Sequence, residues 1–325
     1  MDWTSERTRR AFGMFTWAVL AYNIGVILWG AYVRVSFSGD GCGAHWPFCN
    51  GEVIPHNMAT PMAIEFTHRT MTSLDSIAVI ALCVWALLAF PRRHAVRLYS
   101  ILSLVFLLAE ALLGAGLVLL RYVAHDQSGG RALYLSAHLT NTMLLLGALT
   151  MTAWLAYTNV ERVEWESIPR QLWGAAVAVI AVSVTGAIAA LGDTLFPAAS
   201  LAAGMQRDLS SASSLLLRLR LLHPFVALLG AAYIIWVAAV LQRRILSERT
   251  RGAAGRVIML TLLQLAVGAV NITLLAPVWM QLTHLFMADV VWIAVVVMMM
   301  EGGVVGRGTI SSASQTYASL RSRTT

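Results

Sequence analysis

Four histidines and one glutamate lie in otherwise apolar stretches of this chain, and the histidines follow an internal repeat. His68 and His223 are 155 residues apart, and His138 and His284 are 146 residues apart. Ionisable groups are costly in an apolar environment and tend to mark functional sites. A neutral imidazole is also a good ligand for iron. The spacing therefore suggests one histidine pair, holding one metal group, in each half of the chain.

Two histidines on different helices in each half favour axial ligation of haem over a zinc site. Zinc normally takes a compact set of three or four ligands, often with thiolates or carboxylates. Haem needs axial ligands, apolar walls and room for a flat ring. Small residues in the candidate helices leave such room, although tight helix–helix contact explains them equally well. These residues are Gly114, Gly116, Gly147 and Gly268.

The glutamate distinguishes the two halves. Glu65 lies three residues before His68, on the same helix face, whereas the position 155 residues later is Arg220. A carboxylate beside one haem could move protons, polarise water or stabilise a developing cation. The alternative is an ion pair with Arg69 or Arg34 at the membrane surface. The asymmetry suggests one reactive haem and one haem that holds electrons.

Other charged residues suggest supporting roles. Arg69 and Arg220 are candidates to pair with haem propionates near the outer surface. Glu110, Asp75 and Asp289 fall inside apolar helices, where they could serve a proton path or be hydrogen-bonded within the bundle. We rank these three below Glu65 because nothing places them beside a histidine on the same helix face.

The elements that carry these residues are membrane-spanning helices. The chain has 325 residues, of which 58% are hydrophobic and 12% charged, and its mean hydropathy is +0.71. Soluble domains are more charged and less apolar. A helix needs roughly 20 apolar residues to cross a bilayer. The sequence therefore predicts an all-α polytopic membrane protein with eight spans, at about 12–36, 62–90, 96–121, 133–157, 170–191, 216–241, 255–276 and 279–301.

The basic residues predict the orientation of these spans. The chain has 23 basic residues, all arginine, against 16 acidic residues, which gives a net charge of +7. The arginines fall mostly in short loops on one side of the predicted bundle. Membrane orientation explains this pattern better than nucleic-acid binding does. Both termini are expected in the cytoplasm, and the long loops 37–61 and 192–215 outside. The expected location is a bacterial or archaeal plasma membrane, with the haem sites near its outer face.

The repeat divides the chain into two four-helix bundles. EALLG at 110–114 resembles QLAVG at 264–268, and Gly30-Ala31 matches Gly186-Ala187. Four helices per half give both halves the same orientation, so a pseudo-twofold axis along the membrane normal is expected. The predicted domains are 12–157 and 170–301, followed by a disordered tail at 302–325.

The first outer loop contains a cysteine pair, Cys42 and Cys49, in a compartment that permits a disulfide. A bond across so short a ring would shape the loop over the first half. Redox exchange with an external partner is the alternative. Cys83, within a predicted span, is expected to be a small buried residue.

Several of these motifs resemble those of one known family, the heme A synthases. The resemblance rests on GAYVR at 30–34, DGCGAHWPFCNG at 40–51, IEFTHR at 64–69 and the three later histidines, and it covers about 12–301. It implies oxidation of the C8 methyl of heme O to a formyl group, which gives heme A for cytochrome oxidase. Some members carry a second cysteine pair in the outer loop between helices 5 and 6, which this sequence lacks.

The resemblance also assigns roles to residues and suggests partners. His68 and His138 would bind the substrate heme O in the domain 12–157. His223 and His284 would bind a permanent heme b in the domain 170–301. Glu65 would be the catalytic acid. Heme O synthase and cytochrome oxidase assembly factors are the implied partners, within a lipid membrane and without nucleic acid, and a homo-oligomer stays open.

Two other function classes remain as alternatives. A di-haem b-type cytochrome could carry electrons from quinol without changing a haem. A transporter built from repeats could use the histidines for a substrate or protons. The presence of Glu65 in only one half favours the enzyme over the carrier. Histidine pairs near one face argue against a transporter, whose site is expected near the midplane.

Overall fold

The protein is a bundle of long helices, as its hydropathy predicts. The computed structural model describes residues 6–158, 160–210, 215–244 and 247–321, with no strand among them. Eight helices in these ranges are long and apolar enough to cross a membrane, which confirms the predicted spans and the all-α class. They are α1 (Glu6–Val35), α2 (Thr60–Ala89), α3 (Ala95–Leu119), α4 (Gly129–Tyr157), α5 (Arg170–Leu195), α7 (Leu215–Arg244), α8 (Glu248–Thr273) and α9 (Val278–Arg321).

Local sequence explains where several helices begin. Pro61 lies in the first turn of α2, where a missing N–H costs nothing. The Ser128 side chain caps α4 by accepting the backbone N–H of Arg131. His94 caps α3 in the same way, accepting the N–H of Val96. Within the spans, helix formation satisfies every backbone group that lipid cannot.

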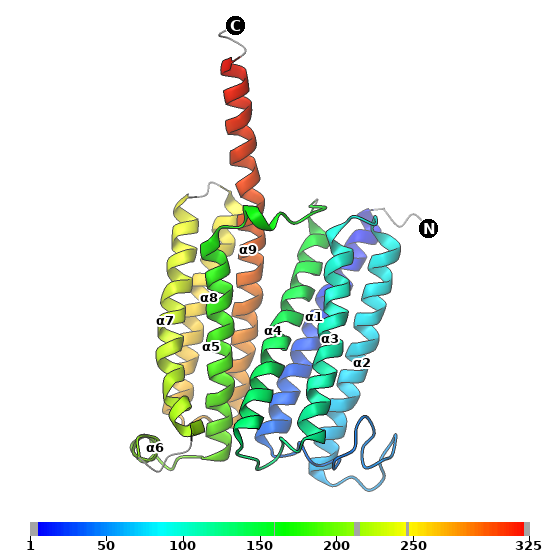
Figure 1. The fold of residues 1–325 in the computed structure, drawn as a ribbon, viewed down its shortest axis with the longest axis vertical. Helices are drawn as coiled ribbons and strands as arrows, with labels where there is room; N and C mark the ends of the chain where they lie inside the picture. The colour runs from blue at the N-terminus through cyan, green and yellow to red at the C-terminus, as the bar shows by residue number, and fades with distance from the viewer. Residues whose placement is uncertain (1–5, 159, 211–214, 245–246, 322–325) are drawn as a thin grey trace.

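The helices of each half contact one another in the same cyclic order. In the first half the neighbours are α1–α2, α2–α3, α3–α4 and α4–α1, and in the second half they are α5–α7, α7–α8, α8–α9 and α9–α5. Figure 1 shows the two groups side by side. Helix α4 packs against α5 and α9, and it is the most buried of the spans. The Trp292 indole of α9 donates to the Met143 carbonyl of α4 at 2.7 Å. The two groups of helices are therefore joined by a hydrogen bond as well as by apolar packing.

The long connections lie at one end of the bundle. The segment between α1 and α2 lies at the opposite end from the start of α1, together with the short helix α6 (Leu201–Asp208) (Figure 1). The start of α1 and the point where α9 leaves the bundle share the other end, near the short 3-10 helix η1 (Trp165–Ser167). All four repeated histidines are therefore close to the end that bears the long connections, because each lies six to nine residues after its helix begins there.

Two details differ from the sequence expectation. Helix α6 forms within the loop 192–215, where only a connection was expected. Where a disordered tail was predicted from residue 302, the structure continues α9 as a helix to Arg321. The segment contains no proline, and each residue added to an existing helix forms one more backbone hydrogen bond. Residues 322–325 of that predicted tail lie outside the described residues.

Candidate functional site

Three of the four repeated histidines lie directly against a glycine of a neighbouring helix. A Cβ atom built on Gly30 would lie 3.0 Å from Cε1 of His68, and one on Gly186 would lie 3.0 Å from Cε1 of His223. On Gly268, it would lie 2.9 Å from Cε1 of His284. The distance at Gly268 is shorter than real Cβ contacts, and the distances at Gly30 and Gly186 are at the tight limit of such contacts. These positions therefore leave the imidazole rings the space that a side chain would fill. Gly30 and Gly186, which the repeat aligns, thus face His68 and His223, which the repeat also aligns.

The second-half pair has a separation that suits one metal ion between two imidazoles. The ring centroids of His223 and His284 are 6.4 Å apart, and the ring planes are inclined at 80°. Two imidazoles that bind one metal ion from opposite sides, with bonds of about 2 Å, place their centroids about 6 Å apart. His223 Nδ1 lies 3.1 Å from the Thr185 hydroxyl, which leaves Nε2 available for a ligand.

The first-half pair has a different environment. Nδ1 of His68 is buried and has no hydrogen-bond partner in the described part of the chain. Nδ1 of His138 lies 3.0 Å from the Glu110 carboxylate, although its ring is not aligned for a hydrogen bond. On the sequence alone, Glu110 ranks below Glu65, because Glu110 and His138 lie on different helices and their contact is not visible in the sequence. The signal that could have found it is the match between Glu110 and Gln264, each of which lies beside the histidine of its own half.

Glu65 is buried at the base of the first outer loop. Its side chain is 4% exposed, and Oε2 accepts the backbone N–H of Cys42 at 2.8 Å. Arg69 donates to Oε1 from Nη2 at 2.5 Å and from Nε at 3.2 Å. The ion pair that the sequence left as an alternative is therefore present in the structure. It lies one helical turn from His68, so a structural contact and a catalytic role are compatible.

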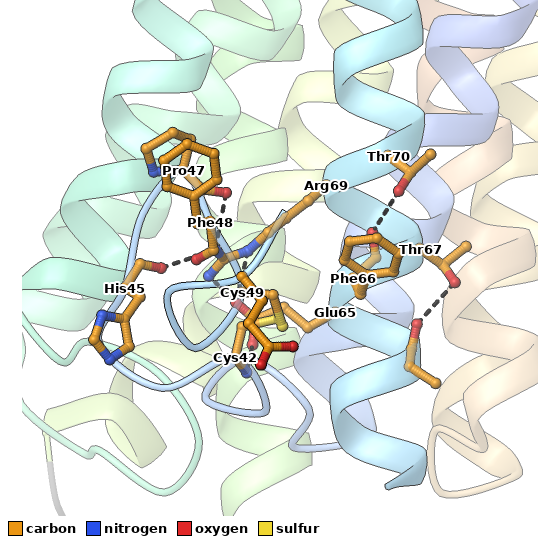
Figure 2. Close-up of a disulfide and its surroundings, with 12 residues drawn as sticks. Cys42, His45, Pro47, Phe48, Cys49, Glu65, Phe66, Thr67, Arg69 and Thr70 are labelled. Carbon is orange, nitrogen blue, oxygen red and sulfur yellow. Dashed lines mark hydrogen bonds and ion pairs between the residues drawn. A yellow bond between two sulfur atoms is a disulfide. The ribbon is translucent and has the colours of Figure 1, made fainter. Parts of the chain in front are cut away.

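Arg69 also holds the loop in place. Its Nη1 donates to the backbone carbonyls of His45 and Phe48, each at 2.8 Å (Figure 2). One guanidinium thereby connects the Glu65 carboxylate to the loop that carries both cysteines. Its contacts in the structure are with protein groups, and the predicted pairing with a haem propionate stays a prediction.

Cys42 and Cys49 form the predicted disulfide. Both residues are buried, and their sulfur atoms are bonded across a sequence separation of seven. Figure 2 shows the disulfide next to Glu65, close to the loop segment whose backbone carbonyls Arg69 binds. Cys83 is a buried free cysteine, as expected. The disulfide thus closes the loop whose backbone N–H meets the Glu65 carboxylate.

Arg220, at the position equivalent to Glu65, holds the outer segment of the second half. It donates from Nε and Nη2 to the carboxylate of Asp208, at 2.5 to 2.9 Å, and from Nη1 to Asp193 at 3.0 Å. Asp208 is the last residue of α6 and is buried. The predicted propionate contact of Arg220 likewise stays a prediction.

These residues fit haem better than a metal ion bound by protein alone. Across the described ranges, no group of three or more histidine, cysteine or acidic side chains could hold a metal ion. A porphyrin supplies four nitrogens itself, so two axial imidazoles complete its iron. The glycines that face three of the four rings are consistent with this requirement.

Comparisons with known proteins agree with the motifs. Residues 13–296 match the COX15-CtaA family, described as cytochrome oxidase assembly proteins. A protoheme IX farnesyltransferase of Thermus thermophilus is 41% identical over 281 residues, which are 86% of this chain and 46% of that protein. A heme A synthase of Exiguobacterium sibiricum is 32% identical over 166 residues, which are 50% of this chain and 53% of that protein.

A further heme A synthase, from Halalkalibacterium halodurans, is 39% identical over 116 residues, or 35% of this chain and 37% of that protein. This chain spans about half the length of the first curated relatives it matches. The family match covers far more than half of this chain, and the eight apolar helices make it a multi-pass membrane protein. The chain belongs to the heme A synthase family of cytochrome oxidase assembly proteins.

Proposed function

We propose that this protein oxidises the C8 methyl group of heme O to a formyl group and so makes heme A. The observation that carries the proposal is the carboxylate of Glu65, which stands one turn before His68 in the first half. The equivalent position in the second half holds Arg220. Two histidine pairs, only one of which has an acid at this position, fit an enzyme with one reacting haem and one resident haem.

In this proposal the first half binds the substrate. His68 and His138 hold the iron of heme O in the domain 12–157. Glu65 is fixed by the Cys42 N–H and by Arg69, so its carboxylate has a set position before the substrate arrives. A preorganised negative charge stabilises positive charge that develops beside it, and the same group can orient water or take a proton.

The second half holds the resident cofactor. His223 and His284 of the domain 170–301 would bind heme b, which supplies one-electron transfer when bound. The chain's own contribution is the placement of the two imidazoles, which the 6.4 Å centroid separation and the facing glycines support. We further propose that Arg69 and Arg220 lie close enough to the outer edge of each site to pair with haem propionates.

The proposed setting is a bacterial or archaeal plasma membrane. Arginines collect in the connections at the end where α1 begins, so the positive-inside rule places both termini in the cytoplasm. The haem sites then lie near the outer face, and the halves are related by a pseudo-twofold axis along the membrane normal. Heme O synthase and cytochrome oxidase assembly factors are the proposed partners, and a homo-oligomer is compatible with this arrangement.

The name of the Thermus relative does not argue for another activity. That name describes a protein of which this chain matches less than half. A di-haem electron carrier is the second candidate, because the ion pair with Arg69 gives Glu65 a structural role without catalysis. The two functions differ in what they do to heme O.

Extraction of haem from the purified protein separates these functions. We expect heme B in every preparation, together with heme O or heme A, and a rise in heme A when the cells also make heme O. Chromatography and pyridine haemochrome spectra identify each species. Heme B alone, at two per chain and unchanged by a supply of heme O, would support the carrier, and protein without haem would contradict both.

A further inference from the structure

The histidine of α4 has a carboxylate beside it that the proposed chemistry does not use. Glu110 of α3 places Oε1 3.0 Å from Nδ1 of His138. The ring of His138 lies at a hydrogen-bond distance without the alignment of a formed hydrogen bond. Rotation of the imidazole about its bond to Cβ changes this alignment without moving either helix. The first half therefore contains the parts of a carboxylate–histidine pair.

Two polar residues of α4 hold Glu110 in this position. Thr142 donates its hydroxyl to Oε1 at 2.5 Å, and Asn141 donates its amide to Oε2 at 2.6 Å. Asn141 also donates to the Phe106 carbonyl of α3, and both donors are buried. Each oxygen of Glu110 thus has its own donor, and the carboxylate cannot turn away from His138 without losing one of them.

The second half carries an amide at the equivalent place. Gln264 of α8 matches Glu110 in the repeat and lies beside His284. Its Nε2 donates to the backbone carbonyl of His284 at 3.1 Å and lies 3.5 Å from the ring Nε2. An amide nitrogen faces the imidazole here, where the first half presents a carboxylate oxygen. The two contacts differ in polarity and also in the ring nitrogen concerned, which is Nδ1 of His138 in the first half and Nε2 of His284 in the second.

We propose that Glu110 is a positioning residue that accepts the Nδ1–H of His138 and thereby directs Nε2 toward the iron of the substrate haem. The inference rests on the proposed function. A carboxylate that accepts the second N–H of a ligating histidine fixes its tautomer and raises its basicity. A more basic ligand stabilises the oxidised metal. The haem of the first half is thereby given a lower reduction potential than an otherwise equal site with an amide neighbour.

The repeat supplies a reciprocal test by exchange of the two residues. Glu110→Gln should raise the reduction potential of the first-half haem by about 60 mV or more, the one-electron equivalent of a tenfold change in equilibrium. Gln264→Glu should lower the potential of the second-half haem. Thr142→Val, which removes one donor to Glu110, should shift the first potential in the same direction as Glu110→Gln but less. Spectroelectrochemical titration of the purified, haem-loaded protein measures both potentials.

Asp75→Asn is the matched control. Asp75 is a buried carboxyl of α2 that accepts the Asn23 amide at 2.7 Å, and it lies two turns from His68. Its replacement should shift the first potential by less than half of the Glu110→Gln shift. An unmoved potential in Glu110→Gln, with haem content as in the wild type, would overturn the inference and leave the proposed function intact. If Glu110→Gln fails to retain haem, Thr142→Val decides, and an unmoved first potential in that haem-loaded variant overturns the inference. Wild-type protein that holds no haem would instead overturn the proposed function.

Discussion

The outer ends of the two halves use the same position for opposite charges. In the first half, Glu65 accepts a backbone N–H from the loop that contains the disulfide. In the second half, the equivalent Arg220 donates hydrogen bonds to the carboxylate of Asp208 at the end of α6. Both residues lie three positions before the histidine of their helix. The scaffold is thus repeated, while the charge next to the histidine is not.

On the proposed function, this difference is what would give one repeated fold two distinct sites. Each half needs a group on its second helix to tie down the outer segment, and either sign of charge can do so. A carboxylate beside the histidine leaves a negative group close to a bound substrate. A guanidinium already paired with two carboxylates leaves no such group. We therefore expect chemistry in the first half and electron transfer in the second.

The largest expected effect comes from separate removal of one histidine in each half. His68→Ala should abolish binding of heme O and heme A and leave heme B in place, because the second pair is intact. His223→Ala should remove heme B while the first site still binds its haem. Quantitative chromatography of haem per chain measures both outcomes. Equal loss of every haem species in both variants would show that the halves do not bind haem independently.

A smaller effect is expected from breaking the anchor of the second half. Asp208→Asn leaves Arg220 without its buried bidentate partner, and such a loss typically costs about 3 kcal/mol in free energy of unfolding. The pair has 12% and 4% exposed side chains, so solvent screens it little. Denaturant unfolding in detergent measures the change. The control is Glu248→Gln, which breaks an exposed pair with Arg251 and should change stability by less than about 1 kcal/mol. Equal effects would contradict the anchoring role.

The smallest expected effect comes from the glycines that face the histidines. Gly30→Ala should crowd His68, and Gly186→Ala should crowd His223, because each new Cβ would lie 3.0 Å from the ring. Overpacking of this kind costs about 1–3 kcal/mol. Each change should lower the haem content of its own half more than that of the other. Gly25→Ala is the control, since a Cβ there would meet no atom within 4 Å.

Hydropathy was sufficient to predict the fold class, because lipid requires about 20 apolar residues for each crossing. The disulfide was predictable for a similar reason, since two cysteines seven residues apart in an outer loop are necessarily close. The neighbours Glu65 and Arg69 are one turn apart on one helix, so their ion pair was available as an alternative from spacing alone.

Contacts between helices were not predictable in this way. Glu110 and His138 lie on different helices, and their contact depends on how α3 and α4 are rotated about their axes. The repeat contained the necessary hint, because it aligned Glu110 with Gln264. The pairing of Arg220 with Asp208 was missed because Asp208 ends a short helix inside a long loop, and the sequence does not show where that loop packs.

The central claim is that Glu65 makes the first-half haem the one that reacts. Glu65→Gln tests it most directly, because the amide oxygen can still accept the Cys42 N–H while the negative charge is lost. The measurement is the heme A formed per chain from supplied heme O, with haem content determined in the same samples. We predict wild-type haem content and at least a hundredfold loss of heme A formation, as expected for an acid–base or electrostatic group. Wild-type formation of heme A by this variant would contradict the claim and leave Glu65 as an anchor of the loop.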